Sequence, residues 1–83
     1  MSLGNAVHLP VPLTLAVSQQ KNGRICRLTG TPDLKHKLEQ QGIIQEKYLE
    51  DIRYEESSSK YVLKINGEQI FLDYITAATI WII

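Results

Sequence analysis

Residues 61–72 read YVLKINGEQIFL, and this stretch decides the fold class. Apolar and polar side chains alternate on both sides of the central Asn66-Gly67 pair, as is typical of strands with one buried face. Asn and Gly both tolerate the positive φ that a tight two-residue turn requires, so the stretch predicts a β-hairpin. With the last apolar run of the chain, the predicted inward side chains are Leu63, Ile65, Ile70, Leu72, Ile80 and Ile82.

Shorter strand signals flank this hairpin. Residues 24–28 and 80–83 are further candidates, and in residues 48–54 an interrupted alternation indicates a bulge. The polar run 55–60 is typical of a turn. Five or six strands in so short a chain favour a small, strongly bent, mostly β barrel or sandwich over a flat sheet.

A single short α-helix is predicted over Asp33–Gln41. Thr31 is a capping residue type, and the proline after it suits the first helical position. Leu34 and Leu38 stand four positions apart, which puts both on one helix face. Gly42 accommodates the left-handed conformation that commonly ends a helix.

The two prolines near the N-terminus predict an extended arm. Pro10 and Pro12 fix their own φ and push the residues before them into extended conformations. Residues 1–12 are therefore expected to form this arm, and residues 13–83 the folded domain. Within the domain, residues 73–79 are expected to be a short connector before the last strand.

Composition limits the class of protein. The chain has 83 residues, enough for one domain, and nine Lys and Arg balance nine Asp and Glu. A nucleic-acid-binding domain usually carries a basic excess, so no nucleic-acid partner is expected. The single cysteine and the lack of an apolar run of about 20 residues favour a cytoplasmic protein without direct membrane insertion. Zero net charge lowers repulsion between copies, which leaves a homo-oligomer open.

The sequence contains no motif for catalysis. It has no phosphate-binding glycine loop, and no motif places a base or an acid beside Cys26, so neither an enzyme nor a catalytic residue is expected. Metal binding has weak candidates: His36 and Glu39, three positions apart on the predicted helix, and Cys26. A further candidate, His8, lies in the arm. No cofactor is expected, unless a transition-metal ion is held weakly.

The opposite face of the C-terminal strands is rich in large apolar side chains. Because successive side chains alternate, Val62, Phe71, Trp81 and Ile83 are expected to point outward. Small monomers seldom expose so many together. Either the arm or the helix covers them, or they form a docking or self-association surface, in which Phe and Trp are typical anchors. The last strand is also expected to have an unpaired edge that invites another chain.

Spaced glycines and aliphatic residues recur in order along almost the whole chain. Four runs form this pattern: Gly23-x-Ile25-x-x-Leu28-x-Gly30, Leu34-x-x-x-Leu38-x-x-x-Gly42-Ile43, Leu63-x-Ile65-x-Gly67-x-x-Ile70-x-Leu72 and Ala77-x-x-Ile80-x-Ile82. Their order and spacing resemble the FeoA family of bacterial ferrous-iron transport accessory proteins. The sequence departs from that family at Gln45-Glu46, where Pro-Gly is usual, and at Asp51, where an aliphatic residue is usual.

The resemblance implies an SH3-like β-barrel with one inserted helix, a domain also found at the C-terminus of DtxR-type iron-dependent repressors. It implies a non-enzymatic role beside FeoB, the membrane ferrous-iron transporter, whose cytoplasmic GTPase part would be bound and modulated. The alternative is a transition-metal-sensing or metal-binding module related to those repressors. The expected partner-binding residues are Val62, Phe71, Trp81, Ile83, Lys35 and His36.

Overall fold

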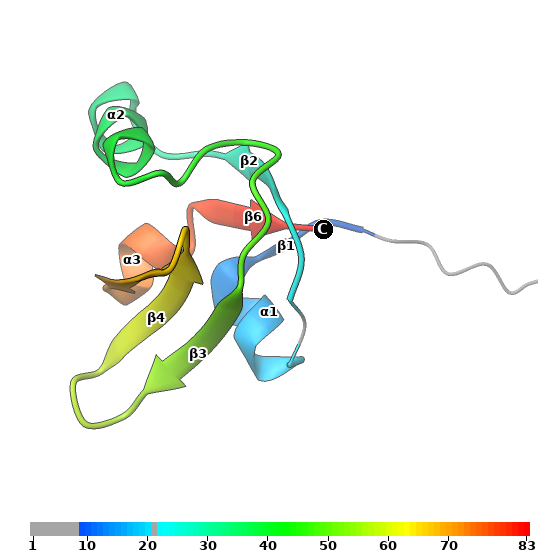
Figure 1. Cartoon of the computed structure of the whole chain (residues 1–83), viewed down its shortest axis with the longest axis vertical. Coiled ribbons are helices and arrows are strands. Elements are labelled where there is room, and N and C mark those ends of the chain that lie inside the picture. Colours follow the sequence, from blue (N-terminus) through cyan, green and yellow to red (C-terminus); the bar gives the residue numbers. More distant parts are fainter. Residues whose placement is uncertain (1–8, 21) are drawn as a thin grey trace, which may run out of the picture.

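The computed structural model of the chain describes residues 9–20 and 22–83. Within these ranges the chain forms six strands in two three-stranded sheets, together with three short helices (Figure 1). The fold is therefore mostly β and consistent with an SH3-like barrel, as expected from the sequence. Residues 1–8, which include His8 and most of the predicted arm, lie outside the described residues.

One antiparallel sheet has the strand order β3-β4-β5. Its strands are β3 (Asp51–Glu55), β4 (Lys60–Ile65) and β5 (Glu68–Leu72). Ile65 pairs with Glu68, so Asn66 and Gly67 form the whole turn, with φ of 53° and 79°. These positive values are what a two-residue hairpin turn requires, and the predicted hairpin is confirmed.

The strand predicted over residues 48–54 is wrong in its extent. Tyr48 makes only an isolated bridge with Arg24, and β3 begins at Asp51 and pairs with β4 in unbroken register. The chain bends between them because Leu49 and Ile52 both pack inward, and residues three apart in one strand would face opposite sides. The register shift occurs instead in β2, opposite β6.

The other sheet has the order β1-β6-β2, with β1 at Val11–Pro12, β6 at Ile80–Ile82 and β2 at Ile25–Leu28. The last strand, β6, therefore has a neighbour on each side, and the expectation that its edge is open is wrong. The end of the predicted arm provides one neighbour, since Pro12 pairs with Trp81. Proline is tolerated there because β1 is an edge strand.

The predicted helix is confirmed as α2 (Pro32–Gln40). The Thr31 hydroxyl accepts a hydrogen bond from the Leu34 N–H at 3.2 Å, which caps the first turn. Gly42 has φ of +89° just after the helix, and the Ile43 N–H donates to the Leu38 carbonyl at 3.0 Å. This pattern satisfies main-chain groups at the end of the helix.

The expectation of a single helix is wrong, because α1 (Leu13–Ser18) and α3 (Tyr74–Ala77) are also present. Both are too short to show a helical period in the sequence. α1 follows directly from Pro12 and buries Leu13 and Ala16 completely. α3 occupies the predicted connector and is capped by Asp73, whose carboxylate accepts a hydrogen bond from the Thr76 N–H at 2.8 Å. Tertiary packing and a side-chain cap therefore produce helices that periodicity does not predict.

The core lies between the two sheets. The predicted inward side chains are buried, with exposed fractions of 8% or less, and α1 and the loop before β3 add Leu13, Ala16, Ile43 and Leu49. Within the described residues, no buried side-chain nitrogen or oxygen lacks a hydrogen-bond partner. The core is thus apolar, and alternation in β4, β5 and β6 assigned its main side chains correctly.

The turn at Gln45-Glu46 keeps a backbone geometry that suits glycine. Glu46 has φ of +74°, in the left-handed region that costs a residue with a side chain about 1–2 kcal/mol. Its N–H donates to the Ile25 carbonyl at 2.7 Å, and its carboxylate pairs with the Arg24 guanidinium at 2.6 Å. Contacts to β2 and to Arg24, the residue just before β2, therefore hold the turn in place.

Replacing Glu46 tests this account of the turn. Glu46→Gly and Glu46→Ala both remove the ion pair, which for an exposed pair contributes less than about 1 kcal/mol. We expect Glu46→Gly to be more stable than Glu46→Ala by about 0.5–1 kcal/mol, because only glycine relieves the positive φ. Chemical denaturation of both variants measures the difference in unfolding free energy. Equal stabilities would show that Glu46 is not strained.

Candidate partner-binding surface

The predicted partner-binding residues do not form one surface. Phe71 and Val62 belong to the β3-β4-β5 sheet, whereas Trp81 belongs to the β1-β6-β2 sheet and Ile83 follows it. Alternation along a strand assigns a side chain to one face of its sheet, but it does not say which sheet the strand joins. The outward residues are therefore divided between two faces of the domain.

Val62 is not available to a partner in this structure, because only 1% of it is exposed. It lies on the outer face of the central strand β4, where Arg53 pairs with it on one side and Phe71 on the other. Both neighbours have longer side chains than valine. The expectation that Val62 is an exposed contact residue is wrong, since alternation gives direction and not exposure.

Phe71 is the large apolar side chain that remains open on this face. It is 50% exposed on β5, an edge strand of its sheet. The other outward residues of the three strands are mostly charged or polar: Asp51, Arg53, Glu55, Lys60, Lys64 and Gln69. The face therefore combines one half-exposed aromatic ring with a charged surround.

Trp81 and Ile83 are both only partly exposed. Trp81 pairs with Pro12 in β1 and with Arg27 in β2, and its indole N–H donates to the Thr29 hydroxyl at 3.3 Å. The main chain of Ile83 exchanges two hydrogen bonds with Arg24. The end of the arm therefore lies beside β6 in the same sheet, and both alternatives that the sequence left open for this face stay predictions.

The predicted partner-binding residues Lys35 and His36 lie on α2, which belongs to neither sheet. Lys35 lines a polar hollow of about 320 Å³ together with Arg27, Leu28, Glu39 and Gln45. The Nε2 atom of His36 lies 3.1 Å from the Nε2 atom of Gln40. His36 does not line the hollow that Glu39 lines.

Metal binding by His36, Glu39 and Cys26 stays a prediction. Cys26 is half-buried in β2, and its carbonyl, not its thiol, accepts a hydrogen bond from the Gln45 side chain at 3.0 Å. Over residues 9–20 and 22–83, the structure brings together no group of three or more His, Cys, Asp or Glu side chains that could hold a metal ion.

A cluster of three tyrosines is a feature that the sequence analysis missed. The rings of Tyr54 and Tyr61 are 4.9 Å apart, and those of Tyr61 and Tyr74 are 6.2 Å apart. Burial raises the pKa of Tyr61, and the neighbouring tyrosines raise it further. Tyr54 and Tyr61 are paired in register on the two strands that the polar turn joins, so the sequence could have predicted this pair. Tyr74 lies on α3, a helix that the sequence did not predict.

A cap at Asp73 holds the exposed side of this cluster in place. Tyr74 and Ile75 begin α3 and are 63% and 76% exposed. Hydrogen bonds from Thr76 lower the pKa of the Asp73 carboxyl, and nearby Lys60 lowers it further. The ionised carboxylate therefore favours the folded conformation of α3.

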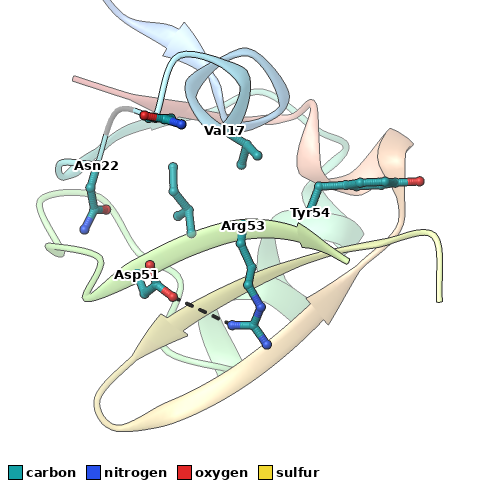
Figure 2. A pocket seen from close by; sticks show the side chains of 7 residues that line it. Val17, Asn22, Asp51, Arg53 and Tyr54 are labelled. Atoms are coloured by element: carbon teal, nitrogen blue, oxygen red, sulfur yellow. Dashed lines mark ion pairs between the residues drawn. The ribbon is translucent and has the colours of Figure 1, made fainter. Parts of the chain in front are cut away.

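A groove lies between α1 and β3, on the side of β3 away from β4 (Figure 2). It has a volume of about 410 Å³ and is called the β3 groove below. Figure 2 shows Val17 of α1 directed towards it, and Asp51 and Arg53 paired on the far side of the strand. The residues that line it are Val17, Gln20, Asn22, Asp51, Ile52, Arg53 and Tyr54.

Comparison with known proteins identifies a family. The family model described as FeoA domain matches residues 11–83, from the start of β1 to the end of β6 and the residue after it. No curated protein and no solved structure gives a significant match. No helix in the described part of the chain is long and apolar enough to cross a membrane.

The Asp73 cap predicts a specific loss of stability in acid. A carboxyl whose pKa is lowered by folding stabilises the fold above its unfolded pKa near 3.9, and this contribution is lost as pH falls through the folded value. We expect the melting temperature of Asp73→Asn to fall less than that of the wild type between about pH 5 and pH 2, because asparagine caps without ionising. Circular dichroism at several pH values measures this.

Asp73→Ala is the matched variant, because it removes the cap and the charge together. It should be less stable than Asp73→Asn already at neutral pH. Parallel curves for the wild type and Asp73→Asn would contradict the assigned role of the carboxylate.

Proposed function

The chain belongs to the FeoA family, and on this premise we propose that it binds the cytoplasmic GTPase part of a FeoB-like ferrous-iron transporter and modulates it. The family places the chain in ferrous iron transport systems, and it is a family of small accessory domains, not a known enzyme family. An accessory domain acts through a surface. The observation that supports the proposal is therefore an apolar side chain left open on an ordered face.

Phe71 is the side chain on which the proposal depends. Half of it is still exposed, so its complete burial in an interface would contribute about 1 kcal/mol from the hydrophobic effect. Val62 lies beside it in register and is already buried, which gives the ring a packed neighbour. A ring held on a sheet loses little conformational freedom on binding, as is typical of interface anchors.

The charged residues around Phe71 provide a rim. Arg53 lies on the same face across β4, with 42% of its side chain exposed. Lys64 is exposed in the same strand as Val62. An apolar centre with charged surroundings is the usual arrangement of a protein interface, in which the rim directs encounter and the centre supplies affinity.

The face that contains Trp81 is the weaker candidate. Its ring is partly covered in the sheet, and its N–H already has a partner in Thr29. Less apolar surface is therefore left to bury there. We assign the main contact to Phe71 and treat Trp81, with Lys35 and His36, as the competing location.

Binding to the isolated cytoplasmic part of the cognate FeoB-like transporter tests the proposal. Isothermal titration calorimetry with and without guanine nucleotide should detect binding by the wild type. We expect Phe71→Ala to weaken it about tenfold, the effect of losing one anchor. Ile75→Ala is the matched control, because it removes an apolar side chain that is more exposed than Phe71 but lies on α3.

The competing location is tested in the same titration. Circular dichroism first has to show that Trp81→Ala is folded. If Trp81→Ala then weakens binding and Phe71→Ala does not, the contact lies on the β1-β6-β2 sheet. If the wild type does not bind in either nucleotide state, the proposed function is wrong.

A further inference from the structure

Residues 47–49, just before β3, make main-chain hydrogen bonds to residues 23–25 on the edge that faces away from β4. β3 itself leaves this edge unpaired among the described residues. The Ile25 N–H donates to the Lys47 carbonyl at 2.8 Å, and the Leu49 N–H donates to the Gly23 carbonyl at 2.9 Å. The Asn22 side-chain amide makes the last of these contacts, to the Leu49 carbonyl at 3.0 Å. Among the described residues, β4 is the only strand that pairs with β3.

The β3 groove lies along this open edge. Four consecutive residues of the strand, 51–54, line it, although alternate side chains of a strand point to opposite faces. Figure 2 shows the Asp51 and Arg53 side chains on the far side of the strand, so these two residues line the groove with their main chain, as expected beside a strand edge, where N–H and C=O groups project. Val17 and Ile52 add an apolar wall next to these groups. The groove therefore offers both main-chain hydrogen bonds and a place for apolar side chains.

The charges of β3 disfavour a second copy of this chain as the occupant. Asp51, Arg53 and Glu55 alternate in sign along the outer face, and Arg53 lies 3.7 Å and 3.8 Å from the two carboxylates. Full-length antiparallel pairing of two β3 strands would place Asp51 opposite Glu55 and Arg53 opposite itself. Parallel pairing in register would place every residue opposite itself. Like charges directly opposite each other destabilise a pair of strands.

We propose that the β3 edge binds an extended peptide segment of another protein, whose residues alternate cation, apolar, acid, apolar, cation. The cations would lie opposite Asp51 and Glu55, and the acid opposite Arg53. The two apolar side chains would then point to the inner face, towards Val17 and Ile52. Because the charge pattern of β3 reads the same in both directions, parallel and antiparallel peptides satisfy it. The inference concerns the chemistry of the groove and does not rest on docking to a transporter.

Labelled synthetic peptides test the proposal on the full chain. The probe has the core Lys-Val-Glu-Val-Lys between Gly-Ser flanks, with both ends blocked, and the matched peptide has Lys-Val-Lys-Val-Lys. Fluorescence anisotropy should show that the wild type binds the first peptide about tenfold more tightly, because the central pair changes from opposite to like charge. In Arg53→Glu, which lies opposite Val62 and disturbs no cross-strand charge pair, the preference should reverse.

Two further measurements separate strand addition from simple charge attraction. N-methylation of all five core residues of the probe removes every main-chain donor that could face β3, in either strand direction, and should abolish binding. Amide hydrogen exchange of residues 51–55 should slow when the probe is bound. Equal affinity for both charged peptides, no reversal in Arg53→Glu, or binding that survives N-methylation of the core would overturn the proposal. So would self-association of the chain that protects the same amides without peptide.

Discussion

The fold depends on the pairing that closes the β1-β6-β2 sheet. Arg24, just before β2, and Ile83, just after β6, exchange two main-chain hydrogen bonds of 3.0 and 3.1 Å. Gly23 makes this approach possible, because a Cβ atom at that position would collide with the Ile83 carbonyl. β6 thereby takes the central place in its sheet, and Ile80 and Ile82 are completely buried.

This closure also determines which surfaces remain for partners. β6 is enclosed by β1 and β2, and among the described residues the edge strands of the second sheet are β3 and β5. β5 carries the half-exposed Phe71, and β3 carries three charges beside a groove. The two surfaces differ in chemistry, since one is an aromatic ring on a sheet face and the other is a main-chain edge with alternating charge. They suit different kinds of contact.

Local signals predicted the elements that are stabilised locally. The turn at Asn66-Gly67, the cap at Thr31 and the left-handed Gly42 each act within a few residues of chain, and all three appear as expected. α1 and α3 did not follow from the sequence, because helices of one or two turns are held by tertiary packing and not by propensity. The tyrosine cluster was missed for the same reason, since Tyr74 lies on α3.

The sequence by itself determined the mostly β fold, the inward side chains of β4, β5 and β6, and the family, because alternation and turn chemistry are properties of neighbouring residues. Only the tertiary structure decided how those strands are divided between two sheets. That division separated Phe71 from Trp81, buried Val62 and opened the groove beside β3. The exposure of a side chain depends on which distant segments of the chain pack against it. Local sequence patterns do not specify those contacts.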